Sequence, residues 1–227
     1  MCGRFSLAAD AFSVKVYLAA KYRISDTSTK LEVPRYNIAP GQQLLSLIND
    51  GKHYRYGYLK WGFVPIFGNK NQIIRKIINF RSESLWDKPY LEKAISSHRC
   101  VVLADGFYEW QKQASGKTPF RIQTTASKLF QMAALWSSHT NEKGEKENTV
   151  ALLTTSPNTK MQAIHERMPV ILDVPATKRW LDPEATTRAS LEELLMPYPD
   201  ILTSYYPVSD LVNNYQNESS DCILERR

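Results

Sequence analysis

The stretch CVVLADGFYEWQ, residues 100–111, decides the fold because it contains two short strand-like runs in succession. Residues 100–104 are apolar and rich in β-branched side chains, and residues 107–111 are largely aromatic, which is typical of strands. Runs of the same kind, bounded by Gly, Asn or Ser, recur at residues 120–124, 129–137 and 149–155. The middle of the chain is therefore predicted to be a succession of short strands.

A β-hairpin is predicted upstream of this stretch. The apolar run 44–48 is followed by the turn sequence NDGK at 49–52 and then by alternating tyrosines, Tyr54, Tyr56 and Tyr58. Asp-Gly supplies residues that adopt the positive φ of a tight turn, and alternation is the period of a strand.

Helices are predicted between and after the strands, from the spacing of apolar residues and from Pro or Ser at their starts. They span residues 8–22, 89–97, 157–165, 176–181 and 190–196. Asn158 and Ser190 are the expected caps of two of them. Strands with helices inserted irregularly indicate an α+β fold with a mainly antiparallel, strongly curved sheet, rather than a doubly wound fold.

Length and composition predict one domain over residues 1–227, since 43% apolar residues can build a sizeable core. The charged segment 140–148 is expected to be a solvated hairpin loop, and the polar tail 213–227 is expected to fray. No run approaches the roughly 18 apolar residues that a membrane helix needs, so we expect no membrane contact.

The three cysteines, Cys2, Cys100 and Cys222, argue against a disulfide framework and a zinc site, because their number is odd and no CxxC spacing occurs. We therefore expect a cytoplasmic protein with no metal and no cofactor. The net charge of +6 favours a nucleic-acid partner, since basic residues neutralise phosphates, although many basic proteins bind none.

Cys2 directly follows Met1, and aminopeptidases remove Met when the next side chain is small. The chain would then begin with an aminothiol, whose amine and thiol have pKa values of roughly 8 and roughly 8.5. The amine can form a Schiff base with an aldehyde, and the thiolate can close a five-membered thiazolidine on the same carbon. Taken alone, Cys2 is better explained as a small buried apolar residue.

Two loop segments contain candidate binding residues. Asn37 and Pro40 lie in a predicted rigid turn, which an asparagine bonded to its own backbone explains adequately. Trp61 and Phe67 accompany glycines and a proline at a strand end, where aromatic rings can stack on nucleic-acid bases. A hydrophobic cap on the sheet explains Trp61 better, whereas Phe67 is nearer the tip of the loop.

Three other polar residues are candidates for chemistry or binding. Arg81 shares one face with Asn79 if this segment is extended, and it could grip a phosphate or pair with a nearby acid. Glu109 lies on the aromatic strand, where its carboxyl either faces solvent or has a raised pKa suited to proton transfer. His165 lies near a helix end, where histidine more often has a structural role.

In order along the chain, these segments resemble the signature of the SRAP family, the SOS-response-associated, abasic-site-processing proteins. The resemblance covers about residues 1–210 and rests on MCGRF (1–5), YNIAP (36–40), Trp61-Gly62 with Pro65, Asn79 with Arg81-Ser82-Glu83, Arg99-Cys100 with ADGFYEW (104–110), and His165 with Arg167-Met168-Pro169. It implies a single α+β domain around a barrel-like β core. It also implies a positively charged groove for single-stranded DNA that contains abasic sites, and we expect a monomer.

The resemblance further implies roles for individual residues. Cys2 would capture the ring-opened aldehyde of an abasic deoxyribose as a thiazolidine, which shields the lesion in the DNA-damage response. Asn37 would help to orient the N-terminal residue, and Asn79 would hold the sugar or the reacting amine. Glu109 would shuttle protons, and His165 would assist at the sugar oxygen and in slow reversal.

DNA contacts are implied at six further positions. Phosphate contacts would come from Arg4, Arg81 and Arg167, and contacts near the flanking bases from Pro40 and either Trp61 or Phe67. The chain departs from the family at two positions. Phe80 stands where the family commonly has Ala, and Phe67 stands where relatives often have Trp, which affects base wedging but not the chemistry.

Other functions remain open on the sequence. In an N-terminal-nucleophile peptidase, the Cys2 thiol would attack a peptide carbonyl with help from Glu109 and His165. With only Met1 before Cys2, we expect no long propeptide. A plain single-strand binding module would use aromatic rings and arginines alone and would leave those three residues without a role. A Schiff base at the sugar aldehyde would also permit β-elimination, a weak lyase activity.

Overall fold

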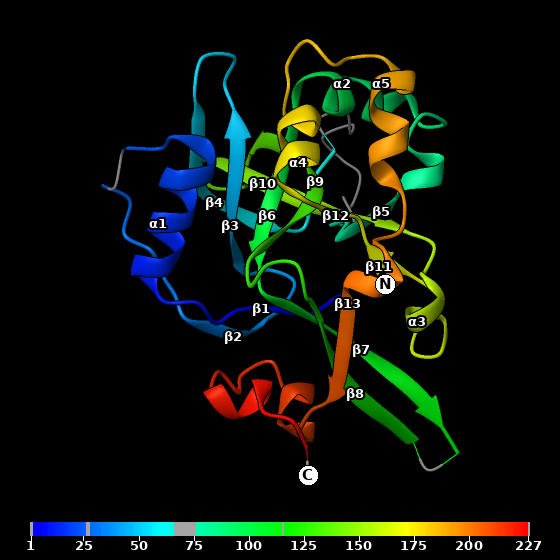
Figure 1. Cartoon of the computed structure of the whole chain (residues 1–227). Coiled ribbons are helices and arrows are strands. Elements are labelled where there is room, and N and C mark those ends of the chain that lie inside the picture. The colour runs from blue at the N-terminus through cyan, green and yellow to red at the C-terminus, as the bar shows by residue number, and fades with distance from the viewer. Residues whose placement is uncertain (1, 26–27, 66–75, 115, 227) are drawn as a thin grey trace.

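One of the two β-sheets closes into a barrel (Figure 1). The computed structural model describes residues 2–25, 28–65, 76–114 and 116–226. In ring order the barrel strands are β10 (Lys146–Thr155), β4 (Tyr54–Trp61), β3 (Gln43–Asn49), β6 (Arg99–Ala104) and β9 (Phe130–Thr140). Pairing of β10 with both β4 and β9 closes the ring, and only the β10–β4 pairing is parallel. The predicted α+β class with a curved, barrel-like and mainly antiparallel core is confirmed.

Strand β6 explains why residues 100–104 form an unbroken apolar run. All six of its residues are buried, including Arg99. Helices α2 (Pro89–Ser97) and α4 (Val174–Trp180) both contact this strand. A strand covered on both faces has continuous apolar residues rather than an alternating pattern.

The second sheet is antiparallel throughout and carries the N-terminal strand near its middle. Its order is β13 (Thr203–Pro207), β8 (Gly116–Thr124), β7 (Gly106–Gln113), β1 (Phe5–Leu7) and β2 (Arg35–Ile38). Three short strands extend the barrel sheet: β5 (Asn79–Arg81), β11 (Met168–Pro169) and β12 (Ile171–Leu172). Strand β7 carries Glu109, strand β5 carries Asn79 and Arg81, and Cys2 and Arg4 directly precede β1.

The predicted hairpin and strands are present, with small shifts at their ends. Strands β3 and β4 are joined by a turn in which Gly51 has φ +89°, as the Asp-Gly pair predicted. Strand β9 ends at Thr140 and β10 begins at Lys146, so only residues 141–145 connect them. These connecting residues are largely exposed, which confirms a solvated hairpin loop.

Helix α1 (Ala11–Tyr22) begins three residues later than predicted because Asp10 caps it by accepting a hydrogen bond from the Ser13 backbone N–H. It ends at Tyr22, because the next residue, Arg23, has a left-handed φ of 55°. Its buried residues are spaced four apart and form one face: Val14, Leu18 and Tyr22.

The other helix boundaries follow from their caps. Asn158 caps α3 (Thr159–Gln162) as predicted, but the helix is shorter than expected. Ser190 does not cap α5 (Arg188–Glu192); Thr187 does, and the Ser190 backbone N–H is the donor to it. The 3₁₀ helices before the C-terminal segment are η1 (Ser82–Ser84), η2 (Glu193–Leu195) and η3 (Asp200–Leu202). No helix in the described ranges is long and apolar enough to cross a membrane.

The expectation that the polar tail frays is wrong for the residues that the structure describes. The tail contains the 3₁₀ helix η5 (Ser220–Ile223) and follows η4 (Asp210–Asn213). Cys222 is buried, and the Glu218 carboxylate accepts hydrogen bonds from the backbone N–H groups of Tyr36 and Asn37. These partners lie more than 170 residues away in sequence, so composition alone did not indicate them.

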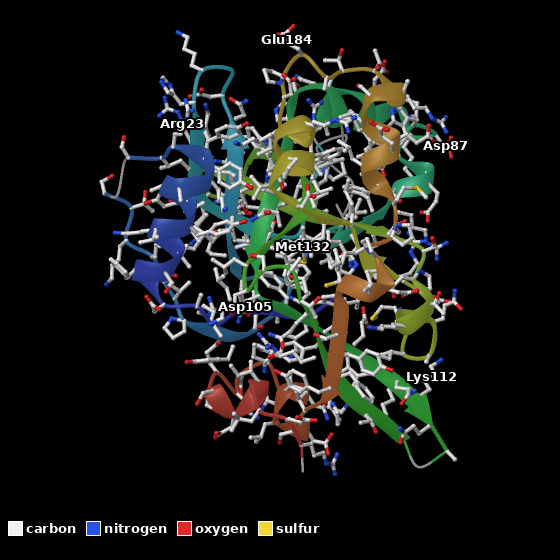
Figure 2. The ribbon with its side chains drawn as sticks, in the orientation of Figure 1. Arg23, Asp87, Asp105, Lys112, Met132 and Glu184 are labelled. Atoms are coloured by element: carbon white, nitrogen blue, oxygen red, sulfur yellow. The ribbon has the colours of Figure 1, made fainter. Side chains whose placement is uncertain are left out.

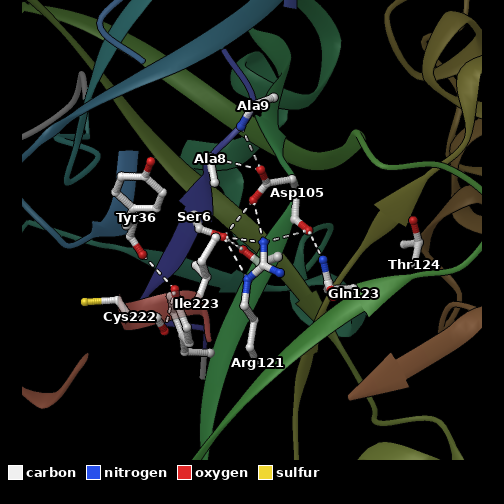
Figure 3. Close-up of polar contacts among 12 residues, drawn as sticks. Ser6, Ala8, Ala9, Tyr36, Asp105, Arg121, Gln123, Thr124, Cys222 and Ile223 are labelled. Atoms are coloured by element: carbon white, nitrogen blue, oxygen red, sulfur yellow. Dashed lines mark hydrogen bonds and ion pairs between the residues drawn. The ribbon is translucent and has the colours of Figure 1, made fainter. Parts of the chain in front are cut away.

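A buried ion pair joins Arg121 of β8 to Asp105 at the corner between β6 and β7, and hydrogen bonds attach the N-terminal strand to this pair (Figure 3). The Asp105 carboxylate lies 2.8 Å from an Arg121 guanidinium nitrogen and accepts a hydrogen bond from Ser6 Oγ at 2.7 Å. It also accepts hydrogen bonds from the backbone N–H groups of Ala8 and Ala9. Figure 2 shows Asp105 well inside the outline of the molecule, unlike Lys112 and Glu184 at its edge.

Replacing Arg121 with methionine is expected to lower the free energy of unfolding by about 3–5 kcal/mol, because Asp105 would remain as an unpaired buried carboxylate. Arg179→Met, which breaks an exposed ion pair with Glu193, is the control and is expected to cost less than about 1 kcal/mol. Urea unfolding of both variants measures the difference. Equal losses of unfolding free energy in the two variants would show that the buried ion pair stabilises the fold no more than the exposed one.

Candidate functional site

The N-terminal segment crosses from the second sheet to the barrel, and Cys2 lies at this crossing. Phe5 pairs with Ile38 on one side and Phe107 on the other, which fixes the direction of the segment. The Cys2 carbonyl accepts a hydrogen bond of 2.8 Å from Asn79 Nδ2 on β5. The backbone of Cys2 is therefore tied to the barrel sheet, while β1 belongs to the second sheet.

The Cys2 thiol is enclosed, with none of the residue exposed to solvent. Burial raises its pKa well above the usual range, and the nearby Glu109 carboxyl raises it further. Its sulfur lies 4.0 Å from the Arg4 carbonyl, a weak contact. The thiol is therefore protonated near neutral pH and needs a base before it can act as a nucleophile.

Glu109 lies near the middle of β7, in a buried position rather than a solvent-facing one. It pairs in register with Phe120 of β8, and only 3% of it is exposed. Burial raises the pKa of its carboxyl from 4.5 to about 7. Both protonation states are therefore populated near neutral pH, which suits a group that both donates and accepts protons.

His165 follows α3 and faces Glu109, with 3.7 Å between its Nε2 and Glu109 Oε2. The backbone N–H of Arg167 donates to His165 Nδ1 at 3.1 Å, so in the neutral ring Nε2 carries the proton. Burial is the main cause that lowers the pKa of His165, which keeps the ring neutral at pH 7. The Nε2–H group therefore lies on the side of Glu109.

Asn79 offers an acceptor as well as the amide that holds Cys2. Its Oδ1 is buried and has no hydrogen-bond partner among the described residues. A buried acceptor without a partner is uncommon in folded proteins and is suited to a donor on a bound molecule. The Asn79 Nδ2 group therefore holds the Cys2 backbone, and its Oδ1 can accept a hydrogen bond from a bound molecule.

Asn37 and Arg4 form a second group that contacts the C-terminal segment. Arg4 donates to Asn37 Oδ1 at 2.7 Å and to the Val212 carbonyl at 2.5 Å, and its guanidinium lies 5.9 Å from the Trp110 ring centre. Asn37 is fully buried. The influence of Asn37 on the N-terminal residue therefore runs through Arg4.

The candidate DNA contacts Arg81, Pro40 and Arg167 fall into an exposed group and a buried one. Arg81 and Pro40 are exposed, and no ion-pair partner for Arg81 lies among the described residues. Arg167 is buried and its guanidinium forms a two-point ion pair with Glu83, at 2.7 and 2.8 Å. Arg167 therefore supports the His165 segment in this structure rather than presenting its charge to solvent.

The two aromatic candidates differ. Trp61 is 1% exposed, packs against Phe5 and donates from Nε1 to the Ile78 carbonyl at 2.9 Å. This position favours the packing role over base stacking. Phe67 lies outside the described residues. Phe80, which stands where the family commonly has Ala, is buried and packs edge-on against Phe63.

The structure thus brings together Cys2, Asn79, Glu109 and His165 around one crossing of strands. Sequence reasoning missed the supporting partners Glu83 and Glu218; Glu83 is within a quoted motif, whereas nothing in the sequence pattern pointed to Glu218. No group of three or more His, Cys, Asp or Glu residues in the described part of the chain is arranged to hold a metal ion.

A family model described as "SOS response associated peptidase (SRAP)" matches residues 1–215. The chain belongs to the SRAP family. The abasic site processing protein YoqW of Bacillus subtilis is 40% identical to this SRAP chain over 225 residues, which cover 98% of the chain and 99% of YoqW. The abasic site processing protein YedK of Escherichia coli is 27% identical over 224 residues, which cover 98% of the chain and 99% of YedK.

A further SRAP relative and a solved structure extend the comparison. The abasic site processing protein HMCES of Xenopus tropicalis is 34% identical over 222 residues, covering 84% of this chain and 65% of HMCES. A crystal structure of a Bacteroides thetaiotaomicron protein superimposes with a TM-score of 0.85 at 22% identity, covering 100% of both chains. At this identity the structural match supports the SRAP fold alone.

Proposed function

We propose that this SRAP protein captures abasic sites in single-stranded DNA through a covalent bond to Cys2, after Met1 has been removed. The observation that carries the proposal is the grouping of an aminothiol precursor with a carboxyl whose pKa is about 7 and a neutral histidine 3.7 Å from that carboxyl. Its relatives YoqW and HMCES are abasic site processing proteins, which supports abasic sites as the target. The protein would act in the cytoplasm, as a monomer, in the DNA-damage response.

The chemistry balances without a cofactor. The Cys2 amine adds to C1 of the ring-opened deoxyribose, and loss of one water gives an imine. The thiol then adds across the C=N bond: sulfur bonds to carbon, and the thiol proton ends on nitrogen. The sum is an aminothiol plus an aldehyde giving a thiazolidine plus water.

The surrounding side chains supply the proton transfers. Glu109 in its ionised form accepts the proton of the sugar hydroxyl during ring opening and later accepts the thiol proton. In its protonated form it supplies the proton with which water leaves. The Nε2–H of His165 donates to the ring oxygen of the sugar, and Asn79 Oδ1 accepts from a sugar hydroxyl.

The positive charge of the protein contributes to binding of the DNA strand. The exposed Arg81 follows Asn79 on β5 by two residues, so it lies on the same strand as the group that would hold the sugar. A guanidinium there can form two hydrogen bonds to one phosphate. The net charge of +6 adds a general attraction for the DNA backbone.

The test compares Met-processed protein on two otherwise identical single strands, one intact and one treated with uracil glycosylase to create an abasic site. We expect a product that survives boiling on a denaturing gel with the abasic strand only. Equal binding of both strands without a covalent product would instead support a plain binding module.

The peptidase alternative receives less support from the site. The Cys2 sulfur contacts the Arg4 carbonyl and burial raises the thiol pKa, whereas a cysteine peptidase needs a thiolate in its first step; in the capture reaction the amine reacts first. Cys2-dependent cleavage of a fluorogenic peptide would favour the peptidase over the capture reaction. Strand cleavage by β-elimination would appear as a slower nick beside the crosslink.

A further inference from the structure

The last part of the chain, residues 208–226, lies across one face of the second sheet, and we call it the strap. Its 3₁₀ helices η4 and η5 contact β8 and β2 respectively, and Figure 1 shows them in red below β2. Val208 and Val212 of the strap are fully buried against Tyr108. The family model ends at residue 215, so more than half of the strap lies beyond the matched residues.

The strap satisfies backbone groups that the irregular edge of the sheet leaves without partners. The pairing of β1 with β2 shifts register between Phe5 and Leu7. The Glu218 carboxylate accepts hydrogen bonds from the two successive N–H groups of Tyr36 and Asn37, and from Arg35 Nε at 3.1 Å. The Glu218 side chain therefore accepts the backbone hydrogen bonds of β2 that a neighbouring strand would otherwise accept.

The strap also holds the Asn37 side chain. The Asn37 amide nitrogen donates to three strap carbonyls, those of Val212 (3.4 Å), Asn214 (3.0 Å) and Asn217 (2.9 Å). An amide nitrogen has two hydrogens, so these carbonyls use its full capacity as a donor. The other end, Oδ1, accepts from Arg4.

These contacts reach Arg4, which lies two residues after the nucleophile Cys2. The Arg4 side chain donates to both Asn37 and the Val212 carbonyl, and the Arg4 carbonyl contacts the Cys2 sulfur. Hydrogen bonds thus run from Glu218 and the strap carbonyls through Asn37 to Arg4, whose carbonyl makes the weak 4.0 Å contact with the Cys2 sulfur. The strap lies far from Cys2 in sequence, but only one residue, Arg4, separates them in this network.

We propose that the strap is a positioning element that sets the place of Cys2 relative to Glu109, and that Glu218 is its key side chain. This inference rests on the proposed capture of abasic sites by Cys2. Displacement of a reacting group by about 1 Å can cost about 100-fold in rate. Loosening the strap therefore slows covalent capture without removing any group that touches the sugar or the phosphates.

The test uses Glu218→Gln in the full chain, with Glu225→Gln as the matched control. Both variants remove one negative charge from the strap, but the exposed Glu225 side chain is not among the groups that bind β2. A glutamine at 218 cannot accept from both the backbone N–H groups, which share Oε1, and Arg35 Nε, which bonds Oε2, because one of its two positions is an NH₂ group. We expect single-turnover crosslinking at saturating abasic DNA to slow by about tenfold or more in Glu218→Gln only.

Two further readouts separate positioning from a general structural effect. Affinity for a strand carrying tetrahydrofuran, an abasic analogue without an aldehyde, should stay unchanged. Alkylation of Cys2 by iodoacetamide, followed by peptide mapping, should become faster as the residue is released from its enclosed position. Asn37→Asp is the second variant, since it keeps the acceptor for Arg4 and places an oxygen against three carbonyls; it should reproduce the slow crosslinking.

The outcomes distinguish this proposal from the capture reaction. Crosslinking and Cys2 alkylation at wild-type rates in Glu218→Gln would overturn the role of the strap, and so would equal slowing in Glu225→Gln. If the wild-type protein forms no crosslink at all, the capture reaction fails, and the change in Cys2 alkylation alone decides whether the strap positions this residue.

Discussion

Replacing Cys2 with serine is expected to abolish the crosslink that survives boiling, while leaving a weaker and reducible bond to the DNA. Serine is small, so Met1 is still removed and the α-amine remains. The amine can form an imine with the sugar aldehyde, but a hydroxyl is a poorer nucleophile than a thiol and does not close a stable ring on it. The measurement is a denaturing gel with and without borohydride, which reduces an imine to a permanent bond.

The matched control is Cys100→Ala, which removes a different buried thiol. Cys100 lies on β6 in the core, and its substitution leaves the N-terminal aminothiol intact. We expect this variant to crosslink like the wild type. A Cys2→Ser protein that gives the same boiling-resistant product without borohydride would show that the thiol takes no part in the bond.

Replacing Glu109 with glutamine is expected to slow crosslinking by about 10²–10⁴-fold, the range of a positioned acid–base group. Glutamine keeps the shape of the side chain and removes its proton transfer. The carboxyl pKa of about 7 predicts that the plot of wild-type crosslinking rate against pH changes slope, or bends, near pH 7. Ring opening and thiol addition need the carboxylate, whereas loss of water needs the acid. The variant should lack this bend when single-turnover rates are measured from pH 5 to 9.

The same substitution should not destabilise the fold above neutral pH. The folded protein holds the Glu109 proton more tightly than the unfolded chain, because burial raises the pKa from 4.5 to about 7. The stability that this proton contributes is complete below about pH 4.5 and is lost as the pH rises toward 7. At pH 8 the wild type therefore buries a carboxylate at a cost that Glu109→Gln avoids, so thermal unfolding should occur at the same or a higher temperature.

Glu192→Gln serves as the control for Glu109, since its carboxylate is exposed and pairs with Arg188 on the same helix. It should leave the rate, the pH bend and the thermal stability close to those of the wild type. A Glu109→Gln variant that crosslinks as fast as this control would remove Glu109 from the reaction. A variant that is slow and also unfolded would be distinguished by its thermal transition.

Local patterns in the sequence predicted the barrel strands well, because each is a short run whose composition matches its burial. The β6 run is continuously apolar since helices cover it on one side and the barrel interior lies on the other. Glu109 also stood out locally, as a lone carboxyl on an aromatic strand. These features depend on neighbours a few residues away, which a single sequence displays.

Features that depend on distant partners could not be predicted in the same way. The family resemblance implies a phosphate contact at Arg167, but it did not indicate that Glu83, 84 residues away, binds the Arg167 guanidinium. The polar composition of the tail predicted fraying, whereas Glu218 and the strap carbonyls bind β2. In both cases the deciding contact joins segments that only the folded topology brings together.

The most direct measurement of the central claim is a peptide map of the covalent product after nuclease and protease digestion. We expect the modified peptide to begin at Cys2, to carry the sugar remnant with the loss of one water, and to resist both iodoacetamide and borohydride, as a closed thiazolidine does. A sugar remnant on a lysine, a modified peptide that retains Met1, or a Cys2 thiol that still reacts with iodoacetamide would contradict the claim.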